Sequence, residues 1–290
     1  MKCEFEEKQY EQLLNNELAG KRRILYIPGQ VSENIFGIDA AIFSKNRKFW
    51  KLWNNRLSYF KIWSLWKSGA YMKPETWDIM EEELNSDTFP KFKFNIFVQY
   101  KRPTYLSNPL GREYGYWNHP YFRYDIKAHQ QKVLYTLEQN VSSNAIVVYA
   151  CPAFWRFREL WDFNERHKLI ENSNFVKPHK LNDHKRYSFI NGGDVGKAFS
   201  NHVDIEGIDL IKEIDRMFEV AEQFKNNSDF LYSLYESIIK IVENLEEDYR
   251  IGFELILKYI KIPQHKLAMS IINILIFIFV TNTVWSIGYK

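Results

Sequence analysis

The chain has 290 residues, of which 46% are hydrophobic, so it is long enough for one large domain or two ordinary ones, and global disorder is excluded. Its 39 Lys and Arg residues nearly balance its 36 Asp and Glu residues, which leaves a net charge of +3. This near-balance excludes a whole-chain field that attracts nucleic acid, so any basic groove must be local. The two cysteines are too few for a disulfide framework or a multi-cysteine zinc site.

The N-terminal segment, residues 1–23, is charged throughout and lacks the apolar run of a secretory signal. Its pattern predicts a short amphipathic helix that ends near Gly20. The low cysteine content favours a reducing compartment. We therefore expect a cytoplasmic location.

The next elements are less regular. A helix-like piece carries Glu33, and "GIDAAIF", residues 37–43, follows a glycine turn and predicts a strand that carries Asp39. Residues 45–69 place aromatic side chains at helical spacing with basic residues between them. A core-facing helix with a solvated basic side is favoured there, and a docking face for a membrane surface or a partner is the alternative. Residues 70–92 indicate an irregular acidic connection.

The middle of the chain predicts an α/β core. "FKFNIFVQYK" predicts a strand, "DIKAHQQKVLYTLEQN" a helix, and "AIVVYACPAFW" a buried strand that stops at Pro152. A loop rich in Pro, Gly, Asn and aromatic residues separates the first strand from the helix. The order of these elements predicts a mixed sheet flanked by helices. After about residue 204 the spacing is helical, so we expect domains at 1–203 and 204–290, the second entirely α-helical.

The C-terminal residues 267–287 carry no charge, and their number is close to the length that spans a bilayer. Polar residues such as Asn273 and Asn282 dilute this segment. A buried helix of the C-terminal region is favoured, and a membrane span is the alternative.

The polar end of the central strand suggests chemistry. Residues two apart on a strand share a face, so Gln99 and Lys101 project together, and Asp39 can approach them if its strand lies in the same sheet. The Asp39 carboxylate, the Gln99 side-chain carbonyl and the Tyr100 main-chain carbonyl are hard oxygen ligands that suit Mg²⁺. Lys101 adds a movable positive charge that can orient or deprotonate a metal-bound water, or stabilise a crowded phosphate.

This ordered set, Asp39 in "GIDAAIF", a long insertion, then "FVQYK" and a helix, resembles the PD-(D/E)XK nuclease superfamily in its Mrr-like Asp…Gln-x-Lys variant. The resemblance covers about residues 20–155. It implies a restriction-endonuclease-like fold and a metal-dependent endonuclease that hydrolyses DNA phosphodiester bonds in restriction or antiviral defence. It also implies that Asp39 and Gln99 bind Mg²⁺ or Mn²⁺, that Lys101 serves catalysis and that Glu33 assists. The chain departs from the commoner pattern because no proline precedes Asp39 and Gln99 replaces a carboxylate.

A basic and aromatic segment near this site predicts DNA contacts. Basic side chains neutralise phosphates and rings stack on bases, and the candidates are Arg102, Arg112, Arg123 and Lys127. An aromatic loop that caps the core is the alternative. Asp125 and Gln131 are weaker candidates for the rim of the site.

Two other functions stay open beside the nuclease. One is a DNA-binding or regulatory subunit that keeps the nuclease fold without turnover, and the other is an effector tethered to the membrane through residues 267–287. A homo-oligomer or a partner protein of a defence system is compatible with each.

Overall fold

The computed structural model describes residues 1–27, 74–141, 143–193, 195–259 and 264–290. These residues form two compact units. Residues 1–26, 93–222 and 281–289 make up unit 1, and residues 27–92 and 223–280, with Lys290, belong to unit 2. This partition differs from the predicted boundary at residue 203, because the chain leaves unit 1 twice and returns to it.

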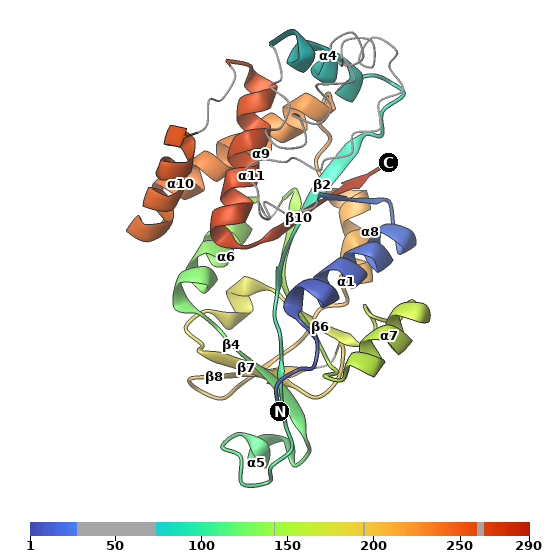
Figure 1. The fold of residues 1–290 in the computed structure, drawn as a ribbon, viewed down its shortest axis with the longest axis vertical. Coiled ribbons are helices and arrows are strands. Elements are labelled where there is room, and N and C mark those ends of the chain that lie inside the picture. Colours follow the sequence, from blue (N-terminus) through green and yellow to red (C-terminus); the bar gives the residue numbers. More distant parts are fainter. Residues whose placement is uncertain (28–73, 142, 194, 260–263) are drawn as a thin grey trace, which may run out of the picture. The chain divides into compact units, whose positions relative to one another are not determined.

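Unit 1 contains a five-stranded sheet with the strand order β1-β10-β2-β5-β6 (Figure 1). The strands are β1 (Ile24–Ile27), β10 (Val284–Tyr289), β2 (Phe92–Tyr100), β5 (Ala145–Pro152) and β6 (Ser173–Val176). β2 and β5 pair in parallel, whereas β6 runs antiparallel to β5. Helix α6 (Ala128–Val141) lies in the connection between the two parallel strands, as such a pairing requires.

A second sheet in unit 1 is antiparallel wherever its pairing is described, with the order β3-β4-β7-β8-β9. Its strands are β3 (Thr104–Leu106), β4 (Tyr121–Asp125), β7 (Arg186–Phe189), β8 (Gly196–Phe199) and β9 (Val203–Ile205). Short helices precede β4 and β7, namely α5 (Tyr114–Trp117) and the 3₁₀ helix Pro178–Leu181. The aromatic loop after β2 therefore contains strands of this second sheet and a short helix. The local sequence pattern did not predict this sheet.

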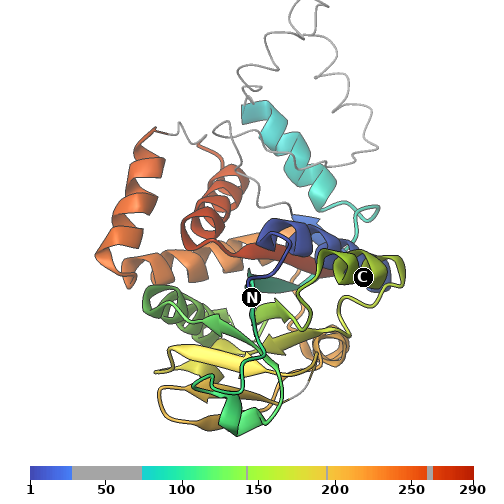
Figure 2. The ribbon, with the colours of Figure 1, turned by 60° about the horizontal axis from the view of Figure 1, so that its bottom comes forward.

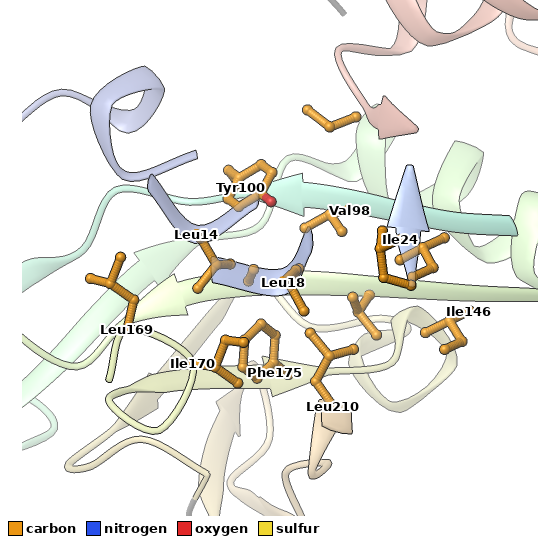
Figure 3. Packing of buried hydrophobic residues seen from close by; sticks show 14 of the residues in the cluster. Leu14, Leu18, Ile24, Val98, Tyr100, Ile146, Leu169, Ile170, Phe175 and Leu210 are labelled. Atoms are coloured by element: carbon orange, nitrogen blue, oxygen red, sulfur yellow. The ribbon is translucent and has the colours of Figure 1, made fainter. Parts of the chain in front are cut away.

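The first sheet is buried on both faces. Val98 and Tyr100 of β2 point toward α1 (Glu7–Lys21), where they pack with Leu14 and Leu18 (Figure 3). On the opposite face, the ring of Tyr149 on β5 contacts the ring of Tyr124 on β4 at 5.9 Å between centroids. Figure 2 shows α1 and the second sheet on opposite sides of the first sheet. Two-sided burial explains why β5 is a nearly continuous apolar run, whereas β2 carries the buried polar residues Lys93, Asn95 and Gln99 on the face opposite α1.

Two further helices complete the α1 side of unit 1, α7 (Phe157–Glu165) and α8 (Leu210–Val220). Leu210, Ile214 and Met217 of α8 are buried in the same hydrophobic cluster as α1. The Asp209 side chain caps α8 by accepting hydrogen bonds from the amides of Ile211 and Lys212.

The described helices of unit 2 are α4 (Pro74–Leu84), α9 (Asn227–Glu243), α10 (Glu247–Tyr259) and most of α11 (Lys266–Thr281). The start of α9 is tied to the end of α4. The Asn227 side chain donates to the carbonyls of Leu84 and Pro90, at 2.8 and 3.0 Å, and accepts from the amide of Phe92 at 2.8 Å. These bonds satisfy main-chain groups that would otherwise be left unpaired where α4 ends and β2 begins.

Several predicted elements are confirmed. The N-terminal helix, the strand at residues 92–101, the following helix and the strand ending at Pro152 correspond to α1, β2, α6 and β5. The prediction of an irregular connection over residues 70–92 is wrong for Pro74–Leu84, because these residues form helix α4. The predicted strand at 37–43, the predicted helix at 45–69 and the site residues Glu33 and Asp39 lie outside the described residues.

The prediction that residues 204–290 are entirely α-helical is wrong. The apolar segment 267–287 is divided between α11, which has 16 residues, and β10, which enters the first sheet between β1 and β2. β-branched and aromatic residues in "VWSIGY" favour a strand, and the indole of Trp285 donates to the Asn95 side chain on β2 at 2.9 Å. Within the described parts of the chain, no helix is long and apolar enough to cross a bilayer.

Replacing Gly288 with alanine is expected to destabilise the protein by about 1–3 kcal/mol, because overpacking forces neighbours to move. An added Cβ on this β10 residue would lie 2.4 Å from the Cζ atom of Phe94, a fully buried side chain of β2. Urea denaturation followed by circular dichroism measures the change. Gly20→Ala is the control, since nothing lies within 4 Å of its Cβ position. Equal stability of the two variants would contradict this packing of β10.

Candidate functional site

The polar end of β2 is fixed by its pairing with β5. Gln99 and Tyr100 lie opposite Tyr149 and Ala150, and the amide of Lys101 donates to the carbonyl of Ala150 at 2.9 Å. Because side chains alternate along a strand, Tyr100 faces the cluster under α1 while Gln99 and Lys101 project to the other face. Both project beside α6 and are linked through the side chain of Gln130. The predicted shared face of Gln99 and Lys101 is thus confirmed.

Gln130 on α6 bridges these two side chains. The Lys101 ammonium donates to Gln130 Oε1 at 2.5 Å, and Gln130 Nε2 donates to Gln99 Oε1 at 2.7 Å. All three side chains are buried. Gln99 Nε2 in turn donates to the main-chain carbonyl of Tyr100 at 3.2 Å. The two oxygens that sequence reasoning assigned to a metal, Gln99 Oε1 and the Tyr100 carbonyl, therefore each accept a hydrogen bond from a side-chain amide group.

Burial lowers the pKa of Lys101 from 10.5 to about 8, because desolvation disfavours the ammonium form. The negative charge of Glu7 acts in the opposite direction, and the positive charge of Lys127 lowers this pKa further. The Lys101 Nζ atom lies 5.4 Å from the ring centroid of Tyr149. Lys101 is thus a buried amine that changes its protonation state close to neutral pH.

Glu7, in the first turn of α1, brings a carboxyl group into the electrostatic surroundings of Lys101. Desolvation by burial raises the pKa of Glu7, and the nearby Lys101 charge partly opposes that rise. Sequence reasoning missed Glu7, because an acidic residue in a first helical turn is ordinarily explained by the helix dipole. It also missed Gln130, although two glutamines on the buried side of an amphipathic helix were an available signal.

The proposed rim residues differ in their surroundings. Gln131 is buried, accepts a hydrogen bond from the hydroxyl of Tyr149 at 2.8 Å and donates to the carbonyl of Pro178 at 2.7 Å. It therefore supports the ring beside Lys101. Asp125 is exposed, and its charge is a minor influence that raises the pKa of Lys101.

The four predicted DNA-binding residues have different surroundings. Lys127 is exposed and close enough to Lys101 for its charge to lower that residue's pKa. Arg102 turns toward the N-terminal segment, where it pairs with Glu6 at 2.9 Å and donates to the Cys3 carbonyl. The other two candidates lie on or beside the second sheet: Arg123 is on β4 and Arg112 is exposed in the preceding loop.

The oxygen donors near Lys101 are of the type that Mg²⁺ prefers, namely a side-chain amide, a main-chain carbonyl and the Glu7 carboxyl. Among the described residues, His, Cys, Asp and Glu side chains form no group of three or more that could hold a metal ion. Asp39, the predicted carboxylate ligand, lies outside that set. The described donors therefore fit Mg²⁺ as partial ligands that need a further carboxylate.

Comparison of the chain with protein-family models, with curated proteins and with solved structures returned no match.

Lys101→Met is expected to stabilise the fold at pH 7 by roughly 2 kcal/mol. A pKa that falls from 10.5 to about 8 corresponds to at most about 3 kcal/mol of destabilisation by the buried charge, and loss of the bond to Gln130 offsets about 1 kcal/mol of the gain. The unfolded chain keeps the lysine proton up to about pH 10.5 and the folded chain loses it near pH 8, so the stability of the wild type rises between these pH values. The advantage of the variant should shrink across that window.

Urea denaturation at pH 7, 8.5 and 10 measures this difference, with Lys168→Met as the control at an exposed lysine. A variant that is less stable than the wild type at pH 7, or that keeps the same advantage at pH 10, would contradict a charged and desolvated Lys101.

Proposed function

We propose that the protein is a metal-dependent deoxyribonuclease that hydrolyses DNA phosphodiester bonds and acts in the cytoplasm in restriction or antiviral defence. The observation that carries the proposal is the buried amine of Lys101, held beside Gln99 at the carboxyl end of a parallel strand by the side chain of Gln130. A buried amine whose pKa is lowered to about 8 by desolvation is typical of a functional site. The fold, a mixed sheet flanked by helices, is compatible with a restriction-endonuclease-like core.

In this proposal Asp39, Gln99 and the Tyr100 carbonyl would hold Mg²⁺ or Mn²⁺, and an acidic residue, Glu33 or Glu7, would assist. A bound divalent ion supplies Lewis-acid activation of water and neutralises charge on the phosphate. To bind an ion through its side-chain oxygen, Gln99 would give up the hydrogen bond from Gln130 or would use the second lone pair of that oxygen.

Lys101 has two roles available at neutral pH. Its ammonium form stabilises negative charge on the scissile phosphate, and its neutral form accepts a proton from the attacking water. Both forms are populated within a unit or so of a pKa of about 8. Gln130 fixes the direction of the amine, since Gln130 Oε1 accepts a hydrogen bond from Lys101 Nζ at 2.5 Å. Positioning of this kind reduces the entropy lost when the reactive geometry forms.

A DNA-binding or regulatory subunit without turnover is the second candidate. It is favoured by the amide hydrogen bonds that Gln99 Oε1 and the Tyr100 carbonyl already accept, because such bonds compete with metal binding. Calorimetric titration separates the two candidates. An intact protein that binds DNA but shows no heat of Mg²⁺ or Mn²⁺ binding in its presence supports the subunit and opposes the nuclease.

Asp39→Ala and Lys101→Ala are expected to reduce cleavage by at least about 100-fold, the usual scale for loss of a catalytic acid or base. Gln99→Glu is expected to lower the Mg²⁺ concentration needed for half-maximal cleavage, because a carboxylate binds Mg²⁺ more tightly than a carboxamide. The assay follows duplex and single-stranded DNA with Mg²⁺ or Mn²⁺. The controls are Asp87→Ala and Lys168→Ala, which remove exposed residues of the same types. Full activity of the Asp39 and Lys101 variants would show that the site is assigned wrongly.

A further inference from the structure

Glu113 carries a buried carboxylate between two arginines of the second sheet. Its side chain is 1% exposed, and its Oε1 atom lies 2.9 Å from Arg186 Nε and 3.8 Å from Arg123 Nη1. Arg123 on β4 and Arg186 on β7 are diagonal neighbours on one sheet face, since Arg123 pairs with Ser188 and Asp125 pairs with Arg186. Glu113 itself belongs to the strap, residues 107–120, which connects β3 to β4 and contains α5 (Figure 1).

This carboxylate is poorly satisfied for a buried charge. Neither oxygen of Glu113, nor the Nε atom of Arg186, has a hydrogen-bond partner among the described residues, so the 2.9 Å contact lacks hydrogen-bond alignment. Glu17, which is 2% exposed, shows the contrast, because it accepts from the amides of Leu169 and Ile170 and pairs with Lys21 at 2.7 Å. A buried carboxylate without aligned hydrogen bonds is costly. The charge of Glu113 therefore complements the two arginines, but its oxygens are not oriented to accept hydrogen bonds from them.

The surroundings of the two arginines suit a different anion. Their side chains are 26% and 27% exposed, so an incoming ligand can reach them. A backbone phosphodiester carries its two non-bridging oxygens on a tetrahedral centre and can align them with both guanidinium groups. The tip of the strap packs little against the rest of the protein, since Leu110 there is 92% exposed.

Aromatic rings lie on the same sheet face. Tyr116, which is 51% exposed, stacks on the ring of His202 at 4.5 Å with an interplanar angle of 12°. Trp117 donates to the Ser188 side chain at 3.0 Å, and the Lys197 ammonium lies 5.0 Å from its ring centroid. Cations that alternate with flat rings are the usual recognition surface for single-stranded nucleic acid.

We infer that Glu113 occupies the position of a nucleic-acid phosphate between Arg123 and Arg186, and that the strap covers a single-strand-binding face of the second sheet. Binding of nucleic acid displaces the Glu113 carboxylate, and a backbone phosphate then pairs with both guanidinium groups. The inference deepens the proposed function, because it takes nucleic acid as the ligand, but it uses none of the residues placed in catalysis.

Glu113→Gln should bind a single-stranded DNA oligonucleotide on the order of tenfold more tightly than the wild type, because a neutral amide competes less with phosphate for the arginines. Fluorescence anisotropy at fixed salt with EDTA measures affinity without cleavage. The gain should disappear when Arg186→Gln is added. Glu171→Gln, which removes an exposed charge elsewhere, is the control and should change affinity little.

No gain for Glu113→Gln over the Glu171→Gln control overturns the inference. If circular dichroism shows that Glu113→Gln is unfolded, the test uses the wild type instead. Hydrogen exchange of residues 107–120 is then measured with and without the oligonucleotide. Faster exchange with saturating oligonucleotide supports displacement of the strap, and unchanged or slower exchange overturns it. Inorganic phosphate that accelerates this exchange at the same molar concentration as the oligonucleotide would show a free-phosphate site and also overturn it. Lys101→Ala separates the two proposals, since it should lose cleavage and retain this binding.

Discussion

The parallel pairing of β2 with β5 is the constraint on which unit 1 depends. Both strands are buried along their described length, with α1 packed on one face of the pair and the second sheet in contact with β5 on the other. A strand covered on both sides has no exposed position along its length for a charged group. β2 nevertheless buries polar residues near both ends, Lys93 and Asn95 close to its start and Gln99 and Lys101 where it meets α6.

The crossover through α6 determines what these residues encounter. The helix returns the chain to the start of β5 and places Gln130 against Gln99 and Lys101, with Gln131 against Tyr149. Two adjacent glutamines thus hold the amine and the ring beside it. The lowered pKa of Lys101 marks an unfavourable burial of charge. Unfavourable burial of a charged group is common where that group has a function.

Glu17 and Glu113 show two ways in which the protein buries a carboxylate. Glu17 is held by main-chain amides and a lysine, which is the arrangement expected of a structural anchor. Glu113 has two cations and no aligned hydrogen bond. The difference follows from their positions, because Glu17 lies in a long helix against the core, whereas Glu113 lies in a strap between two strands of the second sheet.

The sequence by itself determined the elements whose signals are local. Apolar runs bounded by turn residues identified β2 and β5, helical spacing identified α1, α6, α8 and α9, and the two-residue period of a strand placed Gln99 and Lys101 on one face. Tertiary structure decided everything that joins distant segments. β10 returns to the first sheet from the end of the chain, the aromatic loop helps to build a second sheet, and Gln130 and Glu7 converge on Lys101. Local periodicity cannot encode such contacts, because they depend on which buried faces pack together and not on the spacing within any one segment.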